Sequence, residues 1–445
     1  MKVANSVIFA IVGIIFSMIG AGSAIAAEAV IEVGAQQHVG FKLALDGTYS
    51  TGKNPLGEPD SDGDRFGIKH YTWAFGDGTP KISGEYSNTV THTYNESGTY
   101  TVRLTVTDYH GITDSVTTDI AVIVLPNVTV SGSTGAAIQS AIDSLGGAGI
   151  VHIPAGTYSV AETLRIPHGV TLKGDGPDKS VLKNTSSTNQ YFLWPTGDNV
   201  RITGLGIAGP GDSNYGIYNG GRRNLFIDNC DIHGFQYAST VTGGGSTTYE
   251  NNFIHNNPTP GYGYGIMVTN AGYAIARNNE FSNNRHNVAS GGNGYTATNT
   301  GYDFINNHVQ YADEAAVDVE LDAHAGANGR IRIVDNLVED VMYFAGFRDG
   351  WGEIRNNVLR NVSGYLMRIG PPTHNGTPVT GAGLRHFHFQ NNEATNSSTR
   401  LWLEQGENIW FNCRRVDNLI PVTDLPLDWN DCAAAPNPPT GLMVN

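Results

Sequence analysis

The feature that most constrains the fold of this chain is a polar residue pair, usually Asn-Asn, that recurs through its second half. The pairs are Asn229-Cys230, Asn251-Asn252, Asn278-Asn279, Asn306-Asn307, Asp335-Asn336, Asn356-Asn357 and Asn391-Asn392. Their second members are separated by 22, 27, 28, 29, 21 and 35 residues. The shortest spacings, of 21 and 22 residues, give the length of one coil, and the longer spacings contain extra residues. This pattern predicts a solenoid with loops inserted on selected coils. Asn tolerates the left-handed backbone of a tight corner, and stacked Asn side chains can hydrogen-bond along the axis.

The composition agrees with short strands joined by many turns. Of the 445 residues, 56 are Gly and only 15% are charged, which favours a turn-rich chain over long surface helices. This length predicts two or three domains. The formal net charge is −15 and no basic run occurs, which argues against a nucleic-acid partner. An acidic polymer would need a local basic patch or a bridging cation.

The N-terminus has the pattern of an export signal. Lys2 precedes an apolar stretch over 7–20, and Ala24-Ile25-Ala26 supplies small residues for cleavage. An uncleaved membrane anchor is the alternative, since residues 3–27 are long enough to span a bilayer. We predict a signal peptide over 1–26 and a secreted or cell-surface monomer with no stable membrane span after cleavage.

Three cysteines occur in the chain. In an exported protein, Cys413 and Cys432 could close one disulfide near the end of the solenoid. Cys230 lies many coils earlier and, at about 4.8 Å per coil, cannot easily reach either. We therefore predict a free thiol at Cys230.

Residues 30–123 alternate between apolar and polar side chains, which predicts an antiparallel β-sandwich. The motif Tyr71-x-Trp73-x-Phe75-Gly-Asp-Gly78, followed by His92-Thr-Tyr94 and the alternating run 98–108, resembles a polycystic-kidney-disease (PKD) type domain. This family usually has Asp where the chain has Ala74. The resemblance implies an immunoglobulin-like spacer or glycan-binding module without catalytic activity.

An acidic loop of the same domain contains Asp60, Asp62 and Asp64. These carboxylates could ligate Ca²⁺ through their oxygen atoms. The alternative is a solvated acidic loop, because no Glu follows at the spacing of an EF-hand.

Residues 124–134 are rich in Pro, Gly, Ser and Thr and are predicted to be a linker. Beyond it, a short helix follows that Gly146-Gly147 ends. Its apolar stripe consists of Ile138, Ala141, Ile142 and Leu145. We expect this helix to cap the open end of the solenoid, and the two linked domains to melt separately.

The region after this helix opens with Gly-Gly-Ala-Gly-Ile-Val-His-Ile-Pro-Ala-Gly-Thr-Tyr over 146–158 and continues with Leu164-x-Ile166-Pro167-x-Gly169-Val-Thr-Leu172. Together with the capping helix, this run resembles the pectate-lyase-like superfamily. This resemblance implies a right-handed single-stranded parallel β-helix over 135–418 with an N-terminal capping helix. Together with the Ig-like β-sandwich that the PKD resemblance implies, it predicts an all-β chain. Lyases, hydrolases, esterases, epimerases and adhesins share this fold. The tail 419–445 resembles the start of a truncated fibronectin-type-III domain.

One predicted strand of the solenoid, over 317–322, contains three carboxylates. With its aliphatic residues inward, Asp318, Glu320 and Asp322 would point outward together. Such a repulsive set favours a functional site, and a salt-bridged solvent face is the alternative. Aligning the coils on their Asn pairs adds Arg285, His286, Arg348 and Arg368 from neighbouring strands.

Two histidines on adjacent coils, His286 and His324, could face each other beside Asp322. Two imidazoles and a carboxylate make either an acid/base set or a divalent metal site. Whether Arg285 or His286 faces outward stays open, because a slip of one residue exchanges them. The candidate catalytic residues are Arg285, His286, Tyr295, Asp322, His324 and Arg348. The candidate substrate-binding residues are Asp318, Glu320 and Arg368, and the candidate Ca²⁺ ligands are Asp318, Glu320 and Asp322.

Three functions fit these residues, all with a polysaccharide or a cell-surface glycan as partner. A lyase acting on a uronate-containing polymer by β-elimination ranks first, because the arginines favour an acidic substrate. An inverting glycoside hydrolase could use two carboxylates of one strand, since alternate residues lie about 6.6 Å apart. A non-catalytic surface or adhesion protein is the third, and an epimerase would share the proton abstraction of the lyase.

Overall fold

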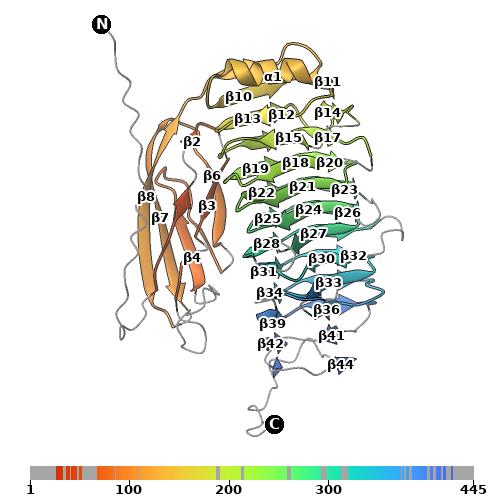
Figure 1. Cartoon of the computed structure of the whole chain (residues 1–445). Coiled ribbons are helices and arrows are strands. Elements are labelled where there is room, and N and C mark those ends of the chain that lie inside the picture. Colours follow the sequence, from red (N-terminus) through yellow and green to blue (C-terminus); the bar gives the residue numbers. More distant parts are fainter. Residues whose placement is uncertain are drawn as a thin grey trace.

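The chain folds into a β-sandwich followed by a parallel β-solenoid, with one helix described between them (Figure 1). The predicted signal peptide, the loop with Asp60, Asp62 and Asp64, and the pair Cys413 and Cys432 lie outside the described residues. The computed structural model describes residues 27–33, 37–40, 42–47, 50–52, 68–85, 87–108, 110–186, 191–211, 215–257, 262–291, 298–311, 319–371, 373–374, 377–379, 383–397, 401–403, 407–411, 414–416 and 422–423.

The sandwich confirms the predicted alternation. Trp73 and Leu104 are fully buried between its two sheets, and the Tyr94 hydroxyl donates to the Phe75 carbonyl at 2.8 Å. One sheet comprises β1 (Glu32–Val33), β3 (Lys42–Asp46) and β6 (Thr89–Thr93). The other comprises β2 (Gln37–His38), β8 (Thr113–Ile123), β7 (Gly98–Asp108), β4 (Ile68–Ala74) and β5 (Ile82–Gly84).

The helix α1 (Gly135–Ser144) caps the first coil, as predicted (Figure 1). The Thr134 side chain accepts a hydrogen bond from the Ala137 amide at 3.3 Å, which starts the helix. Ile138 and Ile142 are buried in the solenoid core. The predicted linker over 124–134 is more ordered than expected, because β9 (Asn127–Thr129) pairs with the first strand of the solenoid proper.

The solenoid winds through three sheets, right-handed as predicted and parallel except at its last pairings. Sheet 1 comprises β9, β10 (Gly149–Ile153), β13 (Val170–Gly174), β16 (Arg201–Thr203), β19 (Leu225–Asp228), β22 (Ser246–Glu250), β25 (Tyr273–Arg277), β28 (Thr300–Ile305), β31 (Asn328–Val334), β34 (Gly350–Arg355), β39 (Leu384–Gln390), β42 (Glu407–Phe411) and β43 (Arg414–Val416). Sheet 2 comprises β11 (Gly156–Val160), β14 (Ser180–Asn184), β17 (Gly206–Ala208), β20 (Asp231–His233), β23 (Phe253–Asn257), β26 (Glu280–Asn284), β29 (His308–Gln310), β32 (Leu337–Glu339), β35 (Val358–Arg360) and β40 (Glu393–Thr395). Sheet 3 comprises β12 (Leu164–Ile166), β15 (Tyr191–Pro195), β18 (Tyr215–Gly220), β21 (Tyr237–Thr242), β24 (Tyr264–Thr269), β27 (His286–Gly291), β30 (Val319–Ala323), β33 (Tyr343–Phe347), β36 (Met367–Ile369), β41 (Leu401–Leu403) and β44 (Val422–Thr423). A separate hairpin pairs β37 (Thr373–His374) with β38 (Thr377–Pro378).

The recurring Asn pairs form the corner between sheets 1 and 2. The first member of each pair has a positive φ of 51–58°, as a tight corner requires. The second members are buried, and each side-chain amide donates to the oxygen of the next at 2.8–3.3 Å. This buried Asn ladder consists of Asn252, Asn279, Asn307, Asn336, Asn357 and Asn392. The ladder fixes the register of the coils, so residues one period apart lie above one another.

The sandwich docks on sheet 1 (Figure 1). Lys42 of β3 forms an ion pair with Glu250 of β22, and the Arg277 guanidinium donates to the Thr89 carbonyl at 3.2 Å. Arg355 adds an ion pair with Glu85 at 3.4 Å. Sheet 1 is thus covered along these strands, while sheets 2 and 3 form the other two faces of the solenoid.

Cys230 is a free cysteine, buried in the core of the solenoid, and burial raises the pKa of its thiol to about 12. Within the described part of the chain, no helix has the length and apolar character needed to cross a membrane.

Candidate functional site

The outer face of sheet 3 gathers the predicted site residues that the structure describes. Strand pairing places Asp322 of β30 between Ala289 of β27 and Gly346 of β33, with Arg368 of β36 beyond. Neighbouring strands lie about 4.8 Å apart, so Asp322 and Arg368 are separated by about two such steps. Both register neighbours of Asp322 are small and buried residues.

Asp322 and His324 form a carboxylate–imidazole pair. The Nε2 atom of His324 lies 3.1 Å from Oδ2 of Asp322, and 38% of the His324 side chain is exposed. The His324 amide donates to the Ser290 carbonyl at 2.8 Å, which fixes the backbone at the end of β30. Asp349 holds the following turn by accepting from the Gly326 amide at 2.8 Å. The pair is therefore held rigidly at the surface, and such pairs act as general bases.

The His286 ring lies beside this pair, whereas Arg285 is the more exposed of the two neighbouring residues that the sequence left as alternatives. The His286 ring is perpendicular to that of His324 with centroids 6.5 Å apart, and it packs against Tyr264 at 5.1 Å. Arg285 lies over the Tyr264 ring and donates to its hydroxyl at 3.2 Å. His286 is nearly buried, so it supports the pair from behind.

Arg348 and Arg368 place two positive charges on the coils after Asp322. The Arg348 amide donates to the Ala323 carbonyl at 2.8 Å, and its side chain is half-buried. The two side chains converge on Gly370, where a Cβ atom would lie 3.5 Å from Arg348 Cγ and 4.0 Å from Arg368 Nε. Arg368 is exposed. Two guanidinium groups near a surface imidazole can bind a carboxylate of a substrate.

Glu320 does not face outward, contrary to the predicted alternation. It is 1% exposed, and its Oε2 accepts a hydrogen bond from Asn287 Nδ2 at 2.7 Å. The strands of sheet 3 begin at a corner where alternation is interrupted, since Phe344 and Ala345 of β33 both lie in the core. Glu320 therefore belongs to a buried polar ladder and not to the outer face.

Two predicted site residues, Tyr295 and Asp318, lie outside the described residues. Glu320 is turned away, so the predicted Ca²⁺ set of Asp318, Glu320 and Asp322 does not share one face. Among the described residues, three metal-ligating side chains converge elsewhere, at Asp231, His233 and His255 on sheet 2.

A row of aromatic rings leads along sheet 3 to His286. Tyr215 stacks on Tyr237 at 4.6 Å, Tyr237 stacks on Tyr264 at 5.3 Å, and Tyr264 meets His286. Tyr191 precedes them in register, and these rings lie outside the solenoid core. We call Tyr191, Tyr215, Tyr237 and Tyr264 the tyrosine row.

Sequence reasoning missed the tyrosine row, Asp349 and the cluster on sheet 2. The coil period contains a signal for two of them, since Tyr215 and Tyr237 are 22 residues apart, as are His233 and His255. Residues one period apart stack when loops add nothing between them. Asp349 offers no such signal, because its partners are backbone amides of distant turns.

Comparison with known proteins agrees with this two-part architecture. Residues 46–124 match the family model of the PKD domain, and residues 130–320 match the model described as rhamnogalacturonase A/epimerase, pectate lyase-like. The sandwich thus matches one family model, and the first part of the solenoid matches another.

Some solved structures match the sandwich alone, and others match a larger part of the chain. The PKD1 domain of the Vibrio cholerae metalloprotease PrtV is 31% identical, over 22% of this chain and 99% of that one, with a TM-score of 0.17. A hyperthermoactive exopolygalacturonase from Thermotoga maritima is 14% identical, over 67% of this chain and 95% of that one, with a TM-score of 0.47. A structure from work on carbohydrate-binding modules of the β-sandwich superfamily is 28% identical over 23% of this chain, with a TM-score of 0.19. This chain spans 36% of that structure's length. The comparison with curated proteins finds no match.

Proposed function

We propose that this chain is a secreted polysaccharide lyase that cleaves a uronate-containing polymer by β-elimination. The observation that carries the proposal is the His324–Asp322 pair at 3.1 Å, with Arg348 and Arg368 on the next two coils. A base beside positive charges on one face is the arrangement that abstraction of a proton next to a carboxylate requires. The predicted export signal over 1–26 supports a place outside the cell or at its surface.

Each residue of the face has a role in this reaction. β-Elimination removes the proton from the carbon bearing the uronate carboxylate and expels the glycosidic oxygen from the adjacent carbon, leaving a double bond. Arg348 and Arg368 neutralise the carboxylate, which makes that proton more acidic. His324 takes the proton, and Asp322 orients the ring and stabilises its positive charge. The expelled oxygen then receives a proton from the imidazolium or from water.

The tyrosine row supports a polymeric substrate. Its rings follow the axis at about the 4.8 Å strand spacing and end at His286, beside His324. Tyr191, Tyr215 and Tyr237 are partly exposed, and their phenol rings combine apolar faces with hydroxyl groups, which suits sugar rings with their mixed surface. A polymer lying along sheet 3 would contact the row and reach the His324–Asp322 pair.

A hydrolase is less well supported by the same face. Inverting hydrolysis uses two carboxylates about 6.5–9.5 Å apart. Of the two carboxylates described in β27, β30, β33 and β36, Asp322 lies at the surface and Glu320 is buried against Asn287. A Ca²⁺ ion bound by Asp318 and Asp322 stays a prediction, and a chelator tests it by slowing cleavage.

The test is a screen of acidic polysaccharides, followed by ultraviolet absorbance for the new double bond. We expect Asp322→Asn and His324→Ala each to lower the rate by at least about 10²-fold, because general acid–base groups contribute that much. Their melting temperatures should stay near wild type, since a partly exposed ion pair contributes only about 0–1 kcal/mol.

His308→Ala is the matched control. His308 pairs with Glu339 on sheet 2 at 3.0 Å with side-chain exposures of 36% and 19%, close to the 38% and 15% of His324 and Asp322. This variant should cleave at the wild-type rate. New reducing ends without a rise in absorbance would indicate hydrolysis, and near wild-type cleavage by both site variants would place the active site elsewhere.

A further inference from the structure

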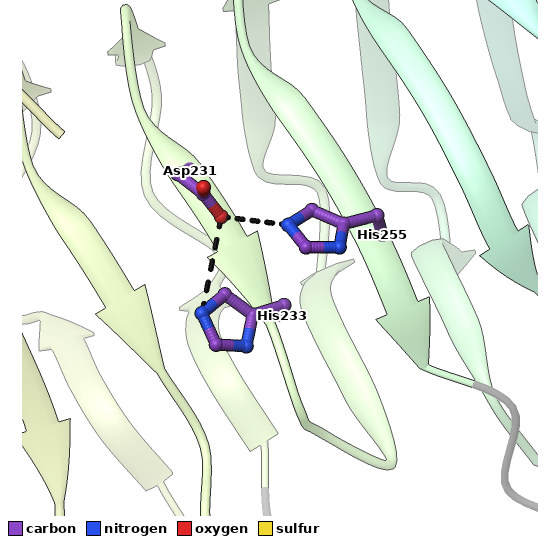
Figure 2. A group of neighbouring side chains, drawn as sticks. All are labelled: Asp231, His233 and His255. Carbon is purple, nitrogen blue, oxygen red and sulfur yellow. Dashed lines mark hydrogen bonds and ion pairs between the residues drawn. The ribbon is translucent and has the colours of Figure 1, made fainter. Parts of the chain in front are cut away.

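A second cluster of chemically active side chains lies on the outer face of sheet 2, apart from the sheet 3 residues of the proposed lyase site (Figure 2). Asp231 and His233 are two residues apart on β20, so both face outward while Ile232 packs in the core. His255 of β23 is the register partner of His233. The three side chains therefore share one face across two adjacent coils.

The distances between their ligand atoms suit a bound metal ion. Oδ1 of Asp231 lies 2.9 Å from Nε2 of His255 and 3.9 Å from Nε2 of His233. All three atoms lie within 4.8 Å of one another. Zinc holds nitrogen and oxygen ligands at about 2.0–2.2 Å, which places tetrahedral ligand atoms roughly 3.3–3.6 Å apart. One distance from Asp231 is shorter than this separation and the other is longer. Small side-chain rotations would therefore bring the three ligand atoms to the separations that a bound zinc ion requires.

The cluster is held in place before any ion binds. The His255 ring stacks on Phe253 with centroids 3.9 Å apart and planes 16° apart. The backbones of β20 and β23 are paired along the solenoid.

We propose that Asp231, His233 and His255 bind a divalent transition-metal ion of the zinc type. Two imidazole nitrogens and one carboxylate oxygen suit Zn²⁺, Co²⁺ or Ni²⁺, whereas Ca²⁺ and Mg²⁺ prefer oxygen ligands. The side chains are 37%, 39% and 13% exposed in that order, so water can complete the coordination. The ion cross-links two coils of the solenoid.

A neighbouring pair on the same sheet shows what distinguishes this cluster from an ordinary ion pair. His308 and Glu339 also lie 3.0 Å apart, but Glu339 accepts from the Arg360 guanidinium at 2.9 Å. The Arg360 guanidinium would repel a metal ion bound at Glu339. At Asp231 the third group is His233, which can donate an electron pair to a metal.

The experiment uses the full chain, stripped with a chelator and then titrated with ZnCl₂ by calorimetry. We expect wild type to bind one ion that is lost in His233→Ala and in His255→Ala. Removing a second-shell partner of a metal costs about 10–100-fold in affinity, so loss of a ligand should cost more than about 100-fold. CoCl₂ should give visible absorption bands in wild type that both variants lack. The His308→Ala control should bind as wild type does.

Melting temperatures separate loss of the site from loss of the fold. Without metal, wild type and the two variants should melt alike, and ZnCl₂ should raise the melting temperature of wild type and of His308→Ala but not of the site variants. An ion bound instead at the sheet 3 face would disappear in Asp322→Asn and persist in His255→Ala. Absence of zinc binding by wild type, or equal binding by wild type and both site variants, would overturn the proposal.

Discussion

Two carboxylates of β30, two residues apart, have different environments and should respond differently to substitution. Glu320 is buried and accepts from Asn287, whereas Asp322 is paired with His324 at the surface. We expect Glu320→Ala to lower the free energy of unfolding by about 1–3 kcal/mol, because the buried Asn287 amide loses its acceptor. Glu320→Gln keeps an oxygen acceptor and should lose less. Asp322→Asn should cost about 0–1 kcal/mol.

Urea denaturation of the three variants measures this order. A larger loss for Asp322→Asn than for Glu320→Ala would mean that the surface pair of Asp322 and His324 stabilises β30 more than the buried hydrogen bond of Glu320 does. The sequence predicts the inward Leu321 and the surface Asp322 through strand alternation. It could not predict the buried Glu320, because the position depends on a corner whose backbone geometry is set by the coil as a whole.

At the scale of elements, the buried Asn ladder holds each coil to the next. The Asn336 amide donates to the Phe304 carbonyl at 2.9 Å and to Asn357 Oδ1 at 2.8 Å, and its oxygen accepts from the Asn307 backbone amide at 2.7 Å. Asn336→Ala leaves these buried groups unpaired at about 1–3 kcal/mol each, so we expect a loss of several kcal/mol in unfolding free energy. Chemical denaturation checks the value.

Asn306→Gly is the control for the ladder. Asn306 is exposed, donates to Asn278 at 2.7 Å and has a φ of 51°, a conformation that Gly adopts without strain. This variant should change stability by less than about 1 kcal/mol. Equal losses for the two variants would show that the corner conformation and not the buried ladder determines stability.

The same ladder explains how much of the fold the sequence predicts. The Asn pairs place the corners, and the spacing between pairs equals the length of each coil, so the solenoid and its capping helix follow from local pattern. Which face of the solenoid carries a site depends on which side chains the neighbouring coil places beside one another. That relation is visible directly where the spacing stays at 22 residues, as for His233 and His255. Where long loops intervene, as between His286 and His324, it emerges only after the coils are aligned on their Asn pairs.

At the scale of the whole molecule, the sandwich is bound to sheet 1 through buried charges. Glu250 of the solenoid pairs with Lys42 of the sandwich and with Arg277 at 3.4 Å, and both carboxylate and guanidinium are largely buried. Arg277 in turn donates to the Thr89 carbonyl of β6. A linker alone would let the domains melt separately, as their sequences suggest, whereas this interface couples them.

Calorimetry of the full chain should therefore show the two domains unfolding in one transition. Glu250→Ala leaves the buried Arg277 charge without its carboxylate, which costs about 3–5 kcal/mol, and we expect it to split off a separate transition of the sandwich. Glu339→Ala on sheet 2 also removes ion pairs, to Arg360 and His308, but Arg360 is exposed and far less is lost. That control should keep the single transition. Two well-separated transitions in wild type would mean that the ion pairs on sheet 1 do not couple the sandwich to the solenoid.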